Sequence, residues 1–221
     1  MTNIPTDKEM APAMALALAA NFGSVQRWRD EFTAMSKAQG AASRWVLLTF
    51  RPSEGTLVNQ IADSDAGPPA GGIPILAVNM DGRAGAEGSG AAAGDRVAAF
   101  MRGIDWEAAY AAYQLAVHDA SEPWGAGHDD VADAVLLDVR RAGMFNQAAT
   151  VIPGSSWHDP AEVASWLGDL SRDQPVVVYC IYGHEVGRAT AMRLRARGLD
   201  ARFLAGGIDG WEKAGRPLQP R

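Results

Sequence analysis

The single cysteine of this 221-residue chain follows a run of β-branched residues and precedes a short loop that contains glycine. The segment reads VVVYCIYGHEVGR from Val176 to Arg188, and Cys180 ends the predicted strand. A helix is predicted from Ala189 to Arg197. Inward-facing N–H groups of such a loop, together with a helix N-terminus, stabilise a thiolate or a bound anion. We therefore expect Cys180 to be a nucleophile with a lowered thiol pKa.

The elements around this loop alternate in type. Strands are predicted at 135–139, 176–180 and 201–204, and helices at 160–170, at 189–197 and around Trp211. Alternation of strand and helix predicts an α/β domain with a central parallel sheet. Ligands of open parallel sheets bind at the carboxyl ends of the strands, which is where Cys180 is expected.

The first half has a different pattern. Two helices, at 6–21 and from Val25, precede predicted strands at 45–50, 56–61 and 73–80. This order predicts an α+β domain in which helices pack on a three-stranded antiparallel sheet. A Gly/Ala/Ser-rich segment at 84–94 is expected to be a flexible loop, and a Gly/Pro-rich segment at 123–130 to be a linker. The expected domains are residues 1–122 and 130–221.

Four motifs stand in order in the second half: VLLDVR from Val135, VIPGS from Val151, VVVYC up to Cys180, and LAGGIDGW from Leu204. Together they resemble the rhodanese-like sulfurtransferase family over about Asp130 to Pro220. The resemblance implies a cofactor-free enzyme that carries a sulfane sulfur as a Cys180 persulfide. Its partners would be a small sulfur donor and a thiol acceptor. The persulfide would lie in a loop formed by Ile181, Tyr182, Gly183, His184, Glu185 and Val186.

Other side chains near the cysteine have supporting or open roles. Asp138 and Arg140 of the VLLDVR strand are expected to be supporting residues, with Arg140 in an ion pair with Asp138 or Glu185. His184 either orients a donor or lies exposed in solvent. Ile181 and Tyr182 occupy positions where thiosulfate-using relatives carry basic residues, which weakens the case for thiosulfate as donor.

Two other functions stay open. Phosphatases and arsenate reductases of the same superfamily use a loop one residue longer, Cys-x5-Arg, whose arginine grips an oxyanion. Here Glu185 and Val186 stand near that position and Arg188 lies further on, so an acidic side chain would repel the dianion. The alternative to an enzyme is a non-enzymatic interaction or stress-sensing module.

The first half resembles the C-terminal domain of iron/manganese superoxide dismutases over about residues 10–118. The segments on which this resemblance rests are Asn21–Ser24, Trp45–Leu48, Gly72–Val78 and Gly103–Trp106. That family supplies an aspartate and a histidine to the metal where this chain has Asn79 and Arg83, and its interface glutamate is replaced by Gly82. An N-terminal helical hairpin that would bring two further histidines is also missing. The resemblance therefore implies a dismutase-like domain without metal.

Composition limits the remaining classes. The net charge of −6 and the pI near 5.2 argue against general nucleic-acid binding. One cysteine excludes an internal disulfide framework, and no apolar stretch is long enough to span a bilayer, so we expect a cytoplasmic protein without membrane partners. The dismutase resemblance raises the option of a homodimer, which the loss of the interface glutamate weakens. Fusion of the two domains points, by association alone, to a stress response.

Overall fold

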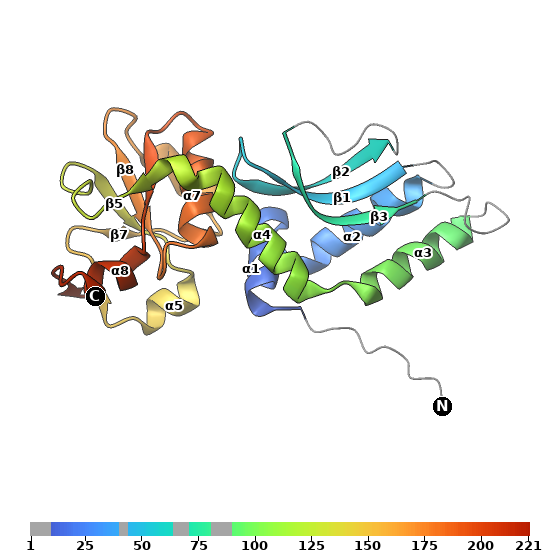
Figure 1. The fold of residues 1–221 in the computed structure, drawn as a ribbon, viewed down its shortest axis with the longest axis horizontal. Helices are drawn as coiled ribbons and strands as arrows, with labels where there is room; N and C mark the ends of the chain where they lie inside the picture. Colours follow the sequence, from blue (N-terminus) through green and yellow to red (C-terminus); the bar gives the residue numbers. More distant parts are fainter. Residues whose placement is uncertain (1–9, 40–43, 64–70, 81–89) are drawn as a thin grey trace. The chain divides into compact units, whose positions relative to one another are not determined.

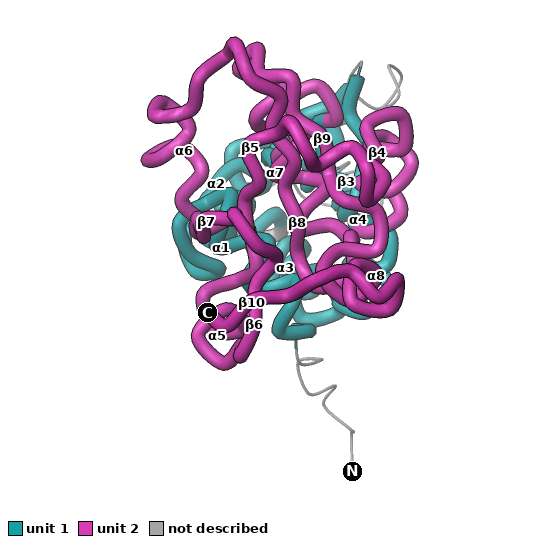
Figure 2. Tube along the Cα trace, turned by 90° about the vertical axis from the view of Figure 1, so that its left-hand side faces the viewer, with its two compact units in different colours: residues 1–51, 57–113 teal, residues 52–56, 114–221 magenta. Residues whose placement is uncertain are grey.

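The computed structural model describes residues 10–39, 44–63, 71–80 and 90–221. The chain divides into two compact units. Unit 1 comprises residues 1–51 and 57–113, and unit 2 comprises residues 52–56 and 114–221 (Figure 2).

Unit 1 is an α+β fold, as the sequence predicts. Its elements are α1 (Pro12–Phe22), α2 (Val25–Ala38), β1 (Arg44–Arg51), β2 (Thr56–Asp63), β3 (Ile73–Asn79), α3 (Gly90–Gly103) and α4 (Trp106–Ser121), of which α4 continues into unit 2 (Figure 1). The three strands form a sheet in the order β2-β1-β3, and β1 pairs antiparallel with β3.

Local sequence explains the junction between the first two helices. Gly23 ends α1 in the left-handed conformation, with φ of 84°, which glycine adopts without steric cost. Ser24 then caps α2 because its hydroxyl accepts a hydrogen bond from the Arg27 N–H at 3.0 Å. Trp28 and Phe32 are four residues apart on α2, so both lie on one helix face, and both are fully buried.

The segment predicted as a flexible loop at 84–94 is only partly described. Residues 84–89 lie outside the described ranges, but α3 already begins at Gly90. The prediction of a loop was therefore wrong for residues 90–94. Three consecutive alanines in this stretch have the highest intrinsic helix propensity, and they offset the two glycines around them.

Unit 2 contains the parallel sheet that the sequence predicts. Its strands are β4 (Gly125–Ala126), β5 (Val135–Asp138), β7 (Ser156–Trp157), β8 (Val176–Tyr179) and β9 (Ala201–Leu204), in the order β4-β9-β8-β5-β7 with every pair parallel. The helices are α5 (Ala142–Gln147), α6 (Val163–Trp166), α7 (Glu185–Arg195) and α8 (Gly207–Lys213), with 3-10 turns η2 (Glu122–Trp124) and η3 (Leu167–Asp169). A separate antiparallel pair joins β6 (Thr150–Val151) to β10 (Gln219–Pro220).

The central strand β8 is buried on both faces. Val176 and Val178 belong to the core that includes Leu194 of α7, whereas Val177 and Tyr179 belong to the core that includes Trp211 of α8. This alternation follows from the two-residue period of a strand. A strand covered on both faces is apolar throughout, which explains the VVVY run.

The predicted linker at 123–130 contains a strand of the sheet. Gly125 and Ala126 form β4, which pairs with Phe203 and Leu204 of β9. A Cβ atom on Gly125 would lie 3.4 Å from the Phe203 ring, so this glycine permits close approach rather than flexibility. The prediction of a linker was therefore wrong for residues 125 and 126, and unit 2 also contains residues 52–56 and 114–122.

Along the described part of the chain, none of the helices has both the length and the apolar character needed to traverse a bilayer.

Candidate functional site

Cys180 follows β8 at the carboxyl edge of the sheet, and its residue surface is only 6% exposed. Backbone N–H groups of Gly183, His184 and Gly187 donate hydrogen bonds to its sulfur. Helix α7 begins at Glu185, four residues before the predicted start, so Glu185 and Val186 are the first helical residues and not part of the loop. A Cβ atom on Gly187 would lie 3.4 Å from Sγ, so glycine leaves room there for a sulfur atom and its contacts.

The first turn of α8 holds the start of the cysteine loop. The N–H groups of Ile208 and Asp209 donate to the carbonyl oxygens of Cys180 and Ile181, each at 3.0 Å. Gly207 has φ of 59°, and a Cβ atom there would lie 2.5 Å from both carbonyl oxygens. These two bonds fix the backbone carbonyl groups at the start of the loop. The GG pair of the LAGGIDGW motif is thus required by contact between two backbones.

Burial raises the pKa of the Cys180 thiol. The N–H groups of Gly187, Gly183 and His184 oppose this shift, and the negative charge of Glu185 adds to it. The expectation of a lowered thiol pKa was therefore wrong. The sequence predicts the N–H donors at the helix start, but the desolvation that outweighs them depends on tertiary packing.

Glu185 is a buried acidic residue beside the cysteine. Its carboxylate lies 3.2 Å from Arg141 Nη2 and accepts a hydrogen bond from Gln114 Nε2 at 3.4 Å. Sequence reasoning assigned no role to Arg141 or Gln114. The second of the two consecutive arginines after the VLLDV strand could have drawn attention to Arg141. No local sequence feature distinguishes Gln114 from its neighbours.

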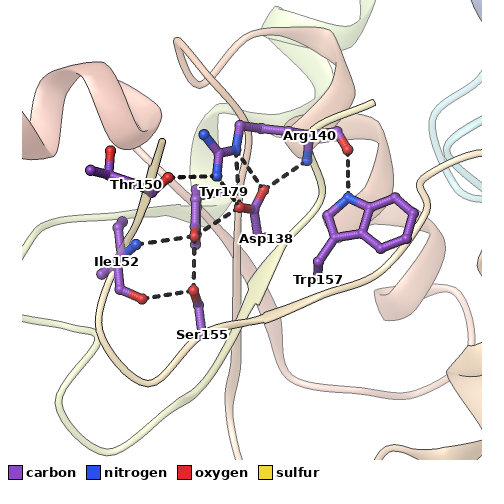
Figure 3. Close-up of polar contacts among 7 residues, drawn as sticks. All are labelled: Asp138, Arg140, Thr150, Ile152, Ser155, Trp157 and Tyr179. Carbon is purple, nitrogen blue, oxygen red and sulfur yellow. Dashed lines mark hydrogen bonds and ion pairs between the residues drawn. The ribbon is translucent and has the colours of Figure 1, made fainter. Parts of the chain in front are cut away.

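The supporting residues Asp138 and Arg140 form a buried ion pair (Figure 3). Arg140 Nε donates to both carboxylate oxygens of Asp138 at 2.9 and 3.0 Å, and Arg140 Nη2 donates to the Thr150 carbonyl at 3.0 Å. Of the two carboxylates considered for Arg140, the structure thus pairs it with Asp138. Tyr179 Oη donates to Asp138 Oδ2 at 3.0 Å, which fixes the residue that precedes Cys180.

The outer face of the loop is aromatic and exposed. Tyr182 and His184 are both solvent-exposed, and their ring centroids are 5.7 Å apart. Ile181 and Val186 are half-buried, and the Val186 carbonyl accepts a hydrogen bond from Thr190 Oγ1. The His184 side chain thus corresponds to the exposed alternative, while its backbone N–H is the part that contacts the sulfur.

Comparison with known proteins identifies both halves. Residues 123–214 match the rhodanese-like domain family, and residues 10–112 match the C-terminal domain of iron/manganese superoxide dismutases. Thiosulfate sulfurtransferase GlpE of Actinobacillus pleuropneumoniae is 32% identical over 88 residues, which cover 39% of this chain and 78% of that protein. The chain therefore belongs to the rhodanese-like family, and in it this domain follows a dismutase C-terminal domain.

The first half is similar to bacterial and archaeal dismutases. The superoxide dismutase [Fe] of Cupriavidus metallidurans is 47% identical over 107 residues, which cover 48% of this chain and 54% of that protein. Superoxide dismutase [Mn] 2 of Haloferax volcanii is 38% identical over 106 residues, which cover 48% of this chain and 52% of that protein. The chain thus spans about half the length of the dismutases that it matches.

The residues of the first half do not fit a redox metal. Asn79, which replaces the ligand aspartate of the family, ends β3. Gly82 and Arg83, which replace the interface glutamate and the ligand histidine, lie outside the described ranges. The sequence has no cysteine and no histidine before His118. Among the described residues, no three His, Cys, Asp or Glu side chains gather in a group suited to a metal ion. Iron and manganese sites need several such ligands around one ion.

The buried network around Tyr179 predicts a loss of stability in Tyr179→Phe. Besides its bond to Asp138, the hydroxyl contacts Ser155 Oγ at 2.8 Å and accepts from the Ile152 N–H at 3.3 Å. Phenylalanine fills the same space but leaves these groups without their partner, so unfolding should become easier by about 1–3 kcal/mol. Urea denaturation checks the value, and an unchanged midpoint would contradict it.

The same substitution should change how stability depends on alkaline pH. Burial, and then the charge of Asp138, raise the pKa of Tyr179 in the folded protein. Above the ordinary tyrosine pKa of about 10, the unfolded chain loses this proton while the folded chain keeps it, so wild-type stability falls as pH rises. The difference in stability between wild type and Tyr179→Phe should therefore shrink above about pH 10.

A further prediction concerns the carboxylate of Glu185, which acts on the cysteine sulfur. Because the charge of Glu185 raises the thiol pKa, Glu185→Gln should lower it and speed alkylation at neutral pH by roughly two- to fivefold. Iodoacetamide reports on Cys180 alone, since the chain has one cysteine. Glu212→Gln, an exposed change on α8, is the matched control and should leave the rate unchanged. Equal or slower alkylation of Glu185→Gln would contradict the prediction.

Proposed function

We propose that this protein is a single-cysteine sulfurtransferase in which Cys180 carries a sulfane sulfur as a persulfide. The observation that supports this most directly is the set of backbone N–H donors around Sγ, from Gly183, His184 and Gly187 at the start of α7. Such donors stabilise negative charge on sulfur without a cationic side chain. The similarity to a thiosulfate sulfurtransferase supports the same reaction class.

The proposed reaction has two displacement steps. In the first, the Cys180 thiolate attacks the outer sulfur of a donor R–S–S⁻, the donor S–S bond breaks, and R–S⁻ leaves. In the second, an acceptor thiolate attacks the outer sulfur of the Cys180 persulfide and regenerates the thiolate. The sulfur is transferred without an external oxidant or reductant. Because burial raises the thiol pKa, the thiolate fraction, and with it the rate of the first step, should increase with pH through the neutral range.

The charges around the loop favour a donor with little negative charge. The loop side chains from Ile181 to His184 include no lysine or arginine, and Glu185 contributes a carboxylate. The nearby Arg141 is paired with that carboxylate at 3.2 Å. We therefore propose the persulfide of a small thiol, or a polysulfide, as a better donor than the thiosulfate dianion, which the Glu185 charge opposes.

The persulfide predicts a mass change in the intact protein. After exposure to a thiol persulfide or polysulfide, wild type should gain the mass of one sulfur, and Cys180→Ser should gain none. Dithiothreitol should remove the added mass. A wild type that gains no sulfur from thiosulfate, mercaptopyruvate, persulfide or polysulfide would overturn the proposed function.

We also propose that the dismutase-like half is an accessory domain without a metal. Its residues offer no histidine or cysteine ligand, so the purified protein should carry far less than one iron or manganese per chain. Elemental analysis after growth with added iron and manganese checks this value. About one bound metal per chain, together with superoxide dismutation, would show that this half is a working dismutase domain.

A second candidate function, a non-enzymatic interaction or sensing module, is favoured by one observation. The 6% exposure and the raised pKa of Cys180 are typical of an unreactive buried cysteine. The two functions differ in turnover. An enzyme transfers many sulfur atoms per chain to an acceptor thiol, whereas a sensor is loaded once and keeps its sulfur.

A further inference from the structure

Arg188 is a charged residue that several contacts hold beside the cysteine loop. It lies one turn into α7, and its side chain is only 12% exposed. Nε donates to the Gly183 carbonyl at 2.8 Å, and Nη1 donates to Ser121 Oγ at 3.0 Å and to the His118 carbonyl at 3.3 Å. All of these residues belong to unit 2. A cation taken out of water needs several acceptors of this kind, and here they come from the loop and from the end of α4.

Two further contacts fix the plane of the guanidinium group. Its central carbon lies 4.1 Å from the centre of the Phe203 ring, and Nη1 lies 3.5 Å from the Glu122 carboxylate. Stacking on an aromatic ring and a forked set of donors are both properties of arginine that lysine lacks. The direction in which Nε points at Gly183 is therefore set by groups outside the loop.

The bond to Gly183 has a consequence for the sulfur. The Gly183 carbonyl and the His184 N–H belong to one planar trans peptide group, so they point in opposite directions. When Arg188 holds the carbonyl on one side, the N–H is directed to the other side, where it donates to Cys180 Sγ. A charged donor on the carbonyl also polarises the amide and strengthens its N–H as a donor.

We propose that Arg188 is a positioning residue for the anion cradle, the set of backbone N–H groups around Cys180 Sγ, and that it acts by aiming and polarising the Gly183–His184 peptide. Arg188 does not touch the sulfur and takes no part in the transfer of sulfur. The inference rests on the proposed function for its purpose, but the property that it concerns, the acidity of the thiol, exists whether or not sulfur is transferred.

The test is the pH dependence of Cys180 alkylation by iodoacetamide in the full chain, measured without any sulfur donor. Arg188→Lys keeps the positive charge but loses the stacked fork of donors, so its thiol pKa should rise and its alkylation near neutral pH should slow by roughly three- to tenfold. At pH values well above the thiol pKa the two rates should converge, because the intrinsic reactivity of the thiolate is retained.

Arg195→Lys is the matched control. Arg195 also lies on α7 and stacks on an aromatic ring, that of Trp124 at 4.9 Å, but it bonds Asp200 and the Ala201 carbonyl instead of the loop. Its alkylation profile should equal that of wild type. An equal shift in Arg195→Lys and Arg188→Lys would overturn the proposal, because it would show a general loosening of the helix.

Ser121→Ala covers the case in which Arg188→Lys does not fold. It removes one acceptor from Nη1 and leaves Arg188 in place, so a smaller shift in the same direction is expected. A wild-type pH profile in every folded variant of Arg188 and Ser121 would overturn the role of Arg188. If the wild type proves unable to transfer sulfur, the proposed function fails, but the alkylation profiles still decide the role of Arg188.

Discussion

The site depends on the contact between two backbones, the loop after β8 and the first turn of α8. That turn binds the carbonyl oxygens of Cys180 and Ile181, and Gly207 is the residue whose missing side chain lets the two backbones touch. This contact fixes the backbone at the start of the cysteine loop, and the N–H groups of Gly183 and His184 that face the sulfur follow directly after it. The cradle around the sulfur is therefore a product of packing between segments distant in sequence.

Electrostatics around this cradle are balanced rather than strongly positive. Backbone N–H groups favour a negative sulfur, while burial and the carboxylate of Glu185 disfavour it. Arg141 pairs with that carboxylate, and Asp138 pairs with Arg140 beside Tyr179, the residue that precedes Cys180. A loop with this charge pattern differs from the oxyanion-binding loops that place an arginine over a phosphate. The difference supports the proposed preference for a donor of low charge over a dianion.

The sequence predicts the fold class of both halves and the position of the cysteine loop because these depend on local patterns. The VVVYC run identifies a strand buried on both faces, and Gly183 marks the loop that follows it. Features that depend on contacts between distant segments were missed. The segment around Gly125 is rich in glycine and proline, as a linker is, but Gly125 and Ala126 form β4, which pairs with β9. The ion pair of Glu185 with Arg141 joins residues that are 44 positions apart in the sequence. The direction of the thiol pKa was missed for the same reason, since desolvation is set by the assembled core.

The raised pKa and the burial of Cys180 also bear on oxidative damage. Peroxides oxidise the thiolate, and exposed thiolates pass through sulfenic acid to the sulfinic and sulfonic acids, of which the last is irreversible. A thiol that is buried and protonated presents little of the reactive form to such oxidants. With one cysteine in these 221 residues, a sulfenic acid would have no second thiol of the chain with which to form a protective disulfide. The enclosure that would slow the proposed first displacement would also protect the reduced sulfur under oxidising conditions.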